Sequence, residues 1–351
     1  MQESRLATSS QNEIHSAVPV LNDMGYPQNF GWSRQPDFLF DPAQIWVSQR
    51  RLSESDRYII FNPTHTVIFE IRDDGYMGYM GVTIVSIKEK KRSTHVLQTL
   101  LPLGAYRMPS GSQSGTTRYR RKKLLLDFVP MEGGVKIIKA DIPKFGHNRR
   151  LRCALVLTEP AHAESLVCNL PWRNDKNAFR YSRCSPWYTV EGVIQFGTKE
   201  IVFLDGNAWG IFDWNRSVRP RADIRYWAAA CGPAAHDHLA GFSIGHSLAD
   251  SSTGTENAFF VDGRLHKLDQ VTFHIPPGNW LSPWRFTSND NRLEMTFNPQ
   301  QERAGRQRML FYSASRRQVY GSFSGKVILD DGSIMDFHNI TGFAERCKTR
   351  F

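Results

Sequence analysis

Apolar and polar residues alternate along most of the chain in short runs that turn residues interrupt. The stretch "RYIIFNPTHTVIFEIRDDGYMGYMGVTIVSI", residues 57–87, predicts three strands in succession, with Asp74-Gly75 as a hairpin turn. The pairs Gly133-Gly134, Asp262-Gly263 and Asp331-Gly332 are further turns of this kind. Helical periodicity is weak, and its clearest run lies between Ile224 and Cys231. The pattern therefore predicts a mainly β protein, made of antiparallel barrels or sandwiches with few short helices.

The same pattern suggests how the chain is divided. Residues 1–20 are polar and irregular, which predicts a flexible N-terminal arm. We expect a first β lobe over residues 21–188 and a second β lobe over residues 189–351. Residues 160–188 carry three prolines and little alternation, so they predict a linker or lid at the end of the first lobe.

Charge is the feature of the composition that bears on partners. The chain has 351 residues, of which 40% are hydrophobic and 22% charged, as in an ordinary globular protein. Lys and Arg number 44 against 34 Asp and Glu, and much of the excess lies in the runs "SIKEKKRSTH", "TTRYRRKKLLLDF" and "KFGHNRRLR". Such runs are either solvated strand ends or a surface for an anionic partner. Without a nucleic-acid-binding motif, weak association with an anionic membrane surface ranks above nucleic acid.

Cysteine usage and the N-terminal residues bear on location. The five cysteines are odd in number and have no CxxC spacing, which argues against a disulfide framework and a structural zinc site. The first residues lack the continuous apolar run of a signal peptide, and no run of about 18 apolar residues occurs. We therefore expect a cytoplasmic protein, and nothing in the sequence indicates its oligomeric state.

Familiar catalytic motifs are missing from the sequence. It has no GxSxG nucleophile elbow, no HExxH, no P-loop, and no GxGxxG placed after a strand and before a helix. His236, Asp237 and His238, with His246 beyond them, are either a polar surface loop or a set of metal donors. We favour the surface loop, and we predict neither a metal nor a cofactor.

The segment "GNAWGIFDWNR", Gly206 to Arg216, is the densest candidate site. Strand alternation places Trp209, Ile211 and Asp213 on one face and Gly210, Phe212 and Trp214 on the other. Facing a barrel interior beside Trp209, Asp213 would have a raised pKa and act as a proton donor. Paired with Arg216, Arg219 or Arg225, it would instead be a structural anchor.

A second candidate site precedes the apolar run Ala258–Phe260. Glu256 and Asn257 either orient a ligand and activate water, or close a turn and meet an arginine. Tryptophans such as Trp227 and Trp284 are either walls of a ligand cavity or core residues.

Several segments resemble a known family. "AWGIFDWNRSVRPRADIRYWAAACG", "TGTENAFFVDGRLHKLDQVTFHI" and "GKVILDDGSIMDFHNITGFAERCKTRF" are similar to an uncharacterised microbial family, domain of unknown function 2804. The likeness covers nearly the whole chain after the first 20 or so residues. More distantly, the W-G-x-x-D-W element resembles one in the lipocalin-like hydroxyneurosporene synthase group of carotenoid hydratases, which also contains fungal cyclases that need no cofactor. That resemblance implies two lipocalin-like lobes and a cavity for an apolar ligand, and it carries over to Trp209, Gly210, Asp213 and Trp214.

Three functions follow from these observations. The first is a cofactor-independent hydratase, cyclase or isomerase acting on a hydrophobic substrate, such as an isoprenoid, polyene or lipid-like molecule, with an acidic residue as proton donor. The second is a non-catalytic lipocalin-like binder of an apolar or amphipathic small molecule, in which Asp213 pairs with an arginine. The third and weaker one is a glycoside-acting enzyme with Asp213 and Glu256 as its carboxylate pair. The candidate catalytic residues are Asp213, Glu256 and His246, and the candidate ligand contacts are Trp209, Trp214, Arg216, Asn257, Trp227 and Trp284.

Overall fold

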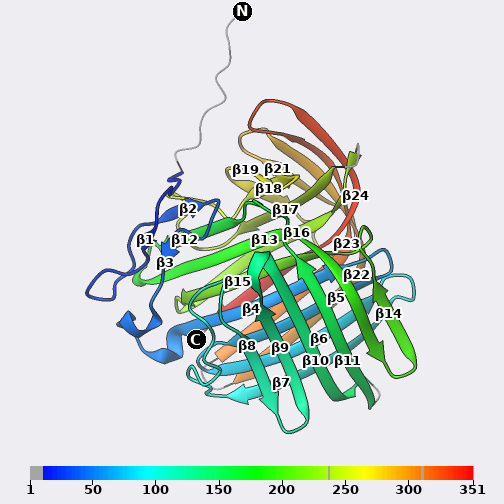
Figure 1. Cartoon of the computed structure of the whole chain (residues 1–351). Coiled ribbons are helices and arrows are strands. Elements are labelled where there is room, and N and C mark those ends of the chain that lie inside the picture. Colours follow the sequence, from blue (N-terminus) through cyan, green and yellow to red (C-terminus); the bar gives the residue numbers. More distant parts are fainter. Residues whose placement is uncertain (1–10, 147, 236–237, 310–311, 351) are drawn as a thin grey trace, which may run out of the picture.

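Two strongly curved antiparallel sheets make up the protein (Figure 1). The structure, a computed structural model, describes residues 11–350 except 147, 236–237 and 310–311. Its helical segments are the single turns η1 (Pro42–Gln44), η2 (Gln49–Arg51) and η3 (Glu132–Gly134). No helix of the described chain has the length and apolar character needed to span a bilayer. The predicted mainly β architecture is confirmed.

The first sheet forms the N-terminal lobe. Its strand order is β7 (Lys91–Leu100), β6 (Met77–Ser86), β5 (His65–Asp73), β4 (Leu52–Phe61), β15 (Trp209–Val218), β13 (Asp175–Phe196), β11 (Arg149–Thr158), β10 (Val135–Phe145), β9 (Leu124–Pro130) and β8 (Thr117–Arg121). The strands β12 (Leu166–Trp172), β14 (Lys199–Phe203) and β2 (Gly31–Ser33) branch from this path at β13. Because β7 lies beside β10 and β8 beside β5, the sheet curls toward a barrel.

The second sheet forms the C-terminal lobe. Its order is β19 (Arg264–Lys267), β18 (Ala258–Val261), β17 (Leu239–His246), β16 (Ala222–Pro233), β24 (Ile334–Arg350), β23 (Tyr312–Ile328), β22 (Leu293–Met309), β21 (Trp284–Ser288) and β20 (Val271–His274). A separate two-stranded ladder joins β1 (Val18–Pro19) to β3 (Phe38–Leu39). The dipeptides expected to turn hairpins lie between β5 and β6, β9 and β10, β18 and β19, and β23 and β24.

The change from one sheet to the other comes later in the chain than expected. β15 lies between β4 and β13 in the first sheet, and β16 begins the second sheet at Ala222. The expected boundary at residues 188 and 189 falls inside β13, a strand of 22 residues. Most of the expected linker, residues 160–188, is strand β12 and the first part of β13. Its alternation is weak because most of these strand residues are buried on both faces.

Two further expectations need correction. The run from Ile224 to Cys231 is strand β16, not a helix, and Trp227 to Cys231 are all buried because both faces of the strand are covered. Residues 11–20 of the expected flexible arm pack on the protein, with the Asn12 amide donating to the Thr253 carbonyl and Val20 fully buried. Residues 1–10 lie outside the described chain.

Each lobe has its own apolar core, and a third apolar cluster joins them. Trp214 belongs to the first core and Trp284 to the second. Ile211 of the first sheet and Trp227 and Phe343 of the second belong to the cluster between the lobes. This cluster fixes the two sheets against each other beside a cleft that polar side chains line.

Candidate functional site

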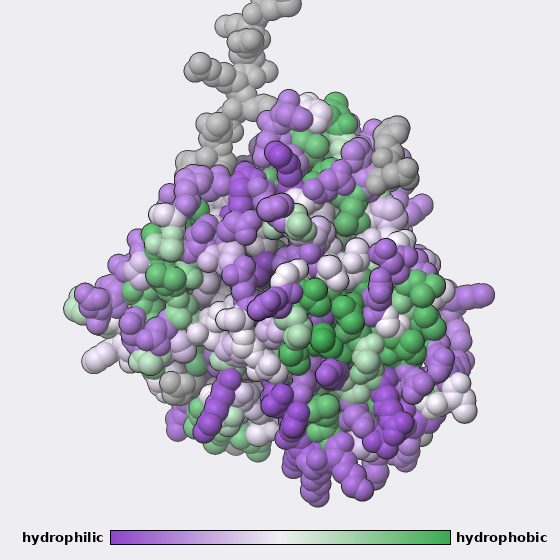
Figure 2. Space-filling model, in the orientation of Figure 1, coloured by the Kyte–Doolittle hydropathy of each residue, from purple (hydrophilic) through white to green (hydrophobic). Residues whose placement is uncertain are grey.

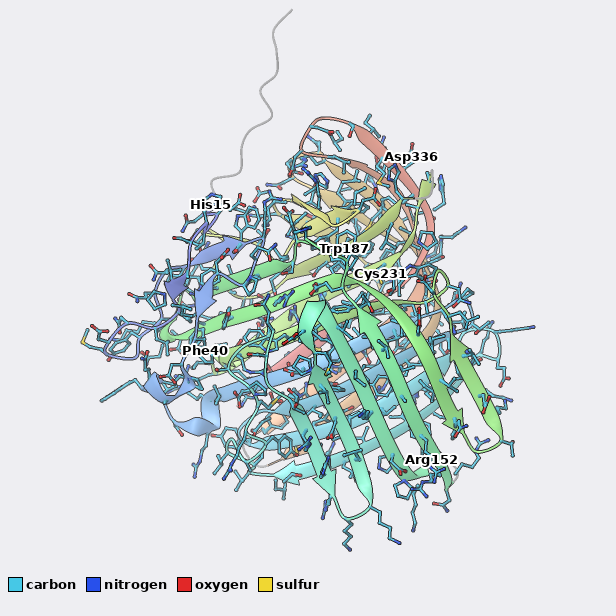
Figure 3. The ribbon with its side chains drawn as sticks, viewed as in Figure 1. His15, Phe40, Arg152, Trp187, Cys231 and Asp336 are labelled. Atoms are coloured by element: carbon cyan, nitrogen blue, oxygen red, sulfur yellow. The ribbon has the colours of Figure 1, made fainter. Side chains whose placement is uncertain are left out.

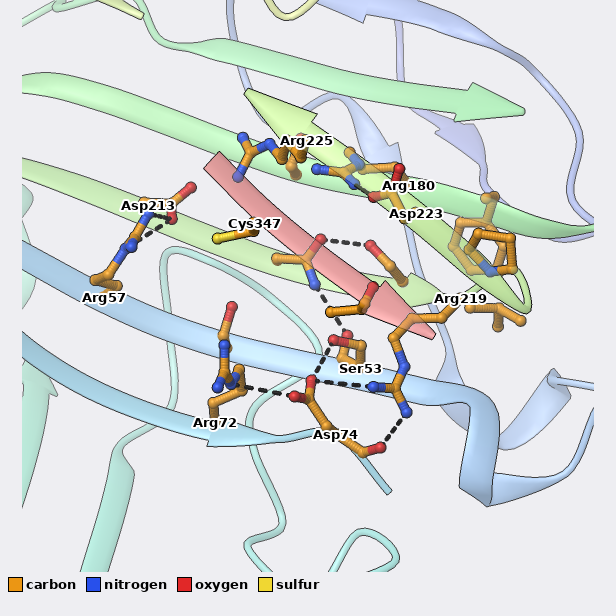
Figure 4. Close-up of a pocket in the computed structure, with 18 of the residues that line it drawn as sticks. Ser53, Arg57, Arg72, Asp74, Arg180, Asp213, Arg219, Asp223, Arg225 and Cys347 are labelled. Atoms are coloured by element: carbon orange, nitrogen blue, oxygen red, sulfur yellow. Dashed lines mark hydrogen bonds and ion pairs between the residues drawn. The ribbon is translucent and has the colours of Figure 1, made fainter. Parts of the chain in front are cut away.

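A cleft of about 140 Å³ opens between β4 and β15 of the first lobe and β16, β23 and β24 of the second (Figure 4). Strand alternation determines which side chains of the first lobe face the cleft, because every second residue of a strand faces the same side. The alternating side chains that β4 and β15 contribute are Ser53, Ser55, Arg57, Asp213, Asn215 and Ser217, and Val218 at the end of β15 also lines the cleft. The expected orientation of Asp213, opposite to Phe212 and Trp214, is confirmed because those two residues lie in the first core.

Asp213 lies in the wall of this cleft as one half of an ion pair. Its Oδ2 accepts a hydrogen bond from Arg57 Nε at 3.1 Å and lies 3.0 Å from Arg57 Nη2. No hydrogen bond from the described residues reaches its Oδ1. With 8% of the residue exposed, Asp213 offers the cleft one free carboxylate oxygen on a side chain that Arg57 holds in place.

Arg57 also connects the two lobes. Its Nη2 lies 3.1 Å from Glu345 Oε1, and Gln318 donates to Glu345 Oε2 at 2.7 Å. Burial disfavours a charged carboxyl, yet the nearby guanidinium groups of Arg57 and Arg316 lower the pKa of Glu345 to about 2. Burial likewise disfavours the Arg57 cation, but the carboxylates of Glu345 and Asp213 raise the pKa of Arg57 above its usual range. The network is therefore charged at neutral pH.

Trp227 packs on this network from β16. The guanidinium carbons of Arg57 and Arg225 lie 4.6 and 5.0 Å from the centroid of its ring, and its Nε1 donates to Ser243 Oγ at 3.0 Å. Cation–π contacts of this kind stabilise arginines that are partly withdrawn from water. Trp227 thus packs against Arg57 and Arg225 and does not itself line the cleft.

The second candidate segment lies at a different cavity. Glu256 pairs with Arg225 at 2.9 Å and Arg180 at 3.5 Å, and it lines a cavity of about 470 Å³ at the mouth of the second lobe. Burial would raise the pKa of Glu256, but the two arginines lower it below its usual value. Asn257 closes the wall, since its Oδ1 accepts from the Gly245 amide at 2.7 Å, and the exposed His246 lies on the rim.

The position of Glu256 affects two of the functional alternatives. Asp213 lines the cleft and Glu256 lines the second cavity, so they do not face one ligand. The two carboxylates predicted for the glycoside-acting alternative, Asp213 and Glu256, therefore do not share a cavity. Arg225 and Arg180 do line the cleft, so Glu256 acts on that site only through these arginines.

The remaining predicted ligand contacts lie away from Asp213. Arg216 is fully buried inside the first lobe, where it meets Asp56 at 2.8 Å, and Trp214 lies beside it. Trp284 is buried in the second core and donates to the Trp280 carbonyl. Trp209 packs at the edge of the apolar cluster between the lobes. Trp214, Arg216 and Trp284 are therefore core residues, and none of the three tryptophans lines the cleft or the second cavity.

The sequence did not single out three titratable residues near these sites. Arg57 lies within the apolar run "RYIIF" and Glu345 within "TGFAERC", and a charge in such a run is the signal that could have found them. Glu54 faces the interior of the first lobe, 3.7 Å from Arg216. Burial, opposed by Arg216 and reinforced by Asp73 and Asp56, raises the pKa of Glu54 to about 7.

The histidine cluster is only partly described. His236 and Asp237 lie outside the described residues, and the exposed His238 meets Asp262 at 2.5 Å. Within the described part of the chain, no three His, Cys, Asp or Glu side chains gather as metal donors.

Comparison with known proteins identifies a family and a shared fold. The model of the family "Domain of unknown function (DUF2804)" matches residues 11–351. A crystal structure of CghA aligns with a TM-score of 0.55 and 10% identity, over 98% of this chain and 96% of that chain. CghA with Sch210972 aligns with a TM-score of 0.52 and 10% identity, over 86% and 89%. Kievitone hydratase from Nectria haematococca aligns with a TM-score of 0.45 and 8% identity, over 85% and 88%. No curated protein sequence matches the chain. The expected family and lipocalin-like fold are confirmed.

Proposed function

This chain belongs to the DUF2804 family, and from that premise we propose that it is a cofactor-independent enzyme of the hydratase, cyclase or isomerase type. In this proposal a small amphipathic molecule binds in the cleft between the lobes, and Asp213 transfers a proton. CghA, which shares the fold, has been crystallised with the small molecule Sch210972, which agrees with a small organic ligand.

The free Oδ1 of Asp213 is the observation that carries the proposal. A carboxylate with one oxygen held by Arg57 and the other facing the cleft is placed to accept a proton. The ion pair therefore favours Asp213 as proton acceptor in the first step, whereas the sequence alone suggested a proton donor. Once protonated, Asp213 can return the proton in the second step.

Arginines supply the complementary charge. Arg225 and Arg316 line the same cleft, where they can stabilise negative charge on a substrate carbonyl or carboxylate oxygen. Asp213 would remove a proton from the carbon next to that carbonyl, and the electron pair would move onto the oxygen. Return of the proton to another carbon of the substrate completes an isomerisation. Delivery of the proton to a departing hydroxyl group instead releases water and completes a dehydration, the reverse of a hydratase reaction.

The size of the cleft constrains the substrate. A volume of about 140 Å³ is below the roughly 300–1,000 Å³ of pockets that enclose a drug-sized ligand. We therefore expect the cleft to hold only the polar end of the molecule. Trp172, Phe179 and Val218 line the same cleft and offer apolar contact to an isoprenoid, polyene or lipid-like remainder.

Hydrogen exchange tests this function before the substrate has been identified. The protein is incubated in D2O with a fractionated small-molecule extract, and deuterium uptake is read by mass spectrometry. We expect the wild type to label a carbonyl or carboxylate compound and Asp213→Asn not to label it. Asp223→Asn is the matched control, because Asp223 is a carboxylate of the same cleft that pairs with Arg180 at 2.8 Å. Equal labelling by the wild type and Asp213→Asn contradicts the proposal.

The carrier alternative has one observation in its favour. A non-catalytic binder predicts that Asp213 pairs with an arginine, and it pairs with Arg57. Native mass spectrometry of the purified protein separates the two functions. A ligand that the wild type and Asp213→Asn retain equally, with no exchange in D2O, indicates a carrier.

A further inference from the structure

Folding brings the three basic runs of the sequence to one end of the first lobe. They lie at the β6–β7, β8–β9 and β10–β11 turns, and the β13–β14 turn adds Lys199. In Figure 1 these turns lie along the lower and right-hand edge of the sheet, and Figure 3 shows Arg152 at the same end. In Figure 2 the lowest part of the surface is mostly hydrophilic.

Strand register explains why the turns meet. Leu125 pairs with Asp141, which sets the β8–β9 turn beside the end of β10. Leu151 pairs with Phe196, which sets the β10–β11 turn beside the end of β13. The β7 strand completes the group, since Gly146 of the β10–β11 turn lies against the side chain of Ser93. Segments more than 100 residues apart in the sequence thus share one surface.

This basic end, defined as residues 88–92, 120–123, 144–146, 148–150 and 199–200, is poorly neutralised by acids. It contains twelve lysines and arginines and two glutamates. One of the two, Glu89, pairs with Lys199 at 3.3 Å and Lys91 at 3.8 Å. Just outside these ranges, Asp127 pairs with Arg120 at 3.1 Å and Asp141 with Arg150 at 2.6 Å, which leaves the other eight lysines and arginines without an ion pair among the described residues. Apart from Arg149, which is half-buried, these lysines and arginines are exposed. The end therefore carries most of the net charge of +10 of the whole chain.

A recess of about 760 Å³ lies within the basic end. It is lined by the cations Lys91, Arg92, Arg149 and Lys199 and by the carboxylates Glu89 and Glu200. Its floor includes the buried side chains of Phe196 and Ile201. Arg149 lies over the ring of Phe196, 4.0 Å from its centroid. Neither Arg92 nor Arg149 forms an ion pair with a described carboxylate. The recess thus offers two arginines to a phosphate group.

We infer that the basic end docks on a lipid bilayer that contains anionic lipids, with the recess receiving a headgroup phosphate. Lysines and arginines close to such a surface are attracted to its negative potential. Single-stranded nucleic acid would need exposed aromatic rings for stacking, but Tyr119, Phe145 and Phe196 beside these turns are buried. Docking would also bring an amphipathic substrate near the protein, although the inference does not depend on the chemistry proposed for the cleft.

Vesicle co-sedimentation tests the inference with the full chain. The wild type is mixed with phosphatidylcholine vesicles, or with vesicles that also contain phosphatidylglycerol, at low and high salt. Lys88→Glu/Lys123→Glu reverses two exposed charges on different turns of the basic end. Arg264→Glu/Arg306→Glu is the matched control, because it makes the same charge change at exposed residues of the second lobe. Circular dichroism confirms that both variants are folded.

We expect salt-sensitive binding of the wild type to the anionic vesicles only. The basic-end variant should bind at least about tenfold more weakly, and the control should bind like the wild type. Equal binding to both vesicle types, equal losses in the two variants, or no sedimentation with anionic vesicles overturns the inference. So does tighter binding to duplex DNA than to the vesicles at the same salt, which would identify nucleic acid as the partner. The D2O exchange experiment on the cleft uses no vesicles. Absence of exchange therefore counts against the proposed function alone, and absence of vesicle binding counts against docking alone.

Discussion

Replacing Glu54 by Gln should stabilise the protein at alkaline pH and have little effect at acidic pH. Glu54 is 4% exposed, and burial, partly opposed by Arg216, raises its pKa from the reference value of 4.5 to about 7. The folded state therefore holds the proton more tightly than the unfolded chain does, so stability is lost as the pH rises from about 4.5 through 7. The two pKa values differ by about 2.5 units, or about 3 kcal/mol of unfolding free energy above pH 8. Glutamine keeps the shape of the neutral carboxyl group and avoids this loss.

Urea unfolding at pH 5 and pH 8.5 measures the effect. The difference between Glu54→Gln and the wild type should be below about 1 kcal/mol at the lower pH and should reach about 3 kcal/mol in favour of the variant at the higher pH. Asp205→Asn, at an exposed turn residue, is the control and should show no such pH dependence. A Glu54→Gln variant that is less stable than the wild type at pH 8.5, or equally shifted at both pH values, refutes the reasoning.

The remaining predictions concern Arg57, Cys347 and Trp284. Arg57→Met leaves Asp213 and Glu345 buried without their shared cation, and it should lower the unfolding free energy measured in urea by about 3–5 kcal/mol. The double variant Arg57→Met/Glu345→Met should recover part of that loss. A loss below about 1 kcal/mol in the single variant would contradict this prediction. Four of the five cysteines are buried, whereas Cys347 is half-buried and lines the cleft, so mass spectrometry should find one thiol alkylated in the native protein. A cleft ligand should slow that reaction, and unchanged labelling would place the ligand elsewhere. Trp284→Ala removes a buried ring of the second core and should lower the unfolding free energy by about 3–5 kcal/mol, measured by thermal or urea unfolding. Exchange of the substrate with D2O in the cleft should be unaffected. Loss of that exchange in a folded variant would assign Trp284 a role in the site.

Local patterns predicted the hairpins because each depends on neighbouring residues. Asp74-Gly75 and Asp331-Gly332 lie in turns because Gly75 and Gly332 have φ values of +71° and +84°, which glycine adopts without strain. The division into lobes was not predictable in this way. β15 belongs to the first sheet because it pairs with β4, and no local signal reports a partner so far along the chain.

The partner of Asp213 could not be predicted from neighbouring residues either, but one of the proposed partners could have been excluded. Its partner Arg57 is 156 residues away, so the arginines nearest in sequence do not include it. Arg216, however, was excludable from the sequence, because residues three apart in a strand face opposite sides. The structure accordingly places Arg216 inside the first lobe and Asp213 in the cleft. Two charged residues an odd number of positions apart in a predicted strand should therefore not be proposed as an ion pair.

The distance in sequence between β4 and β15 has a consequence for the nascent chain. β4 emerges from the ribosome and can pair with β5 at once, but its other edge stays open until β15 has been made. That edge carries the apolar run Tyr58–Phe61, which is a template for unwanted pairing with other chains. Arg57 precedes this run and places a charge beside it, as gatekeeper residues do, and in the folded protein it is the partner of Asp213. We therefore expect the same arginine to hinder unwanted pairing of the nascent chain and to hold the carboxylate of the finished site.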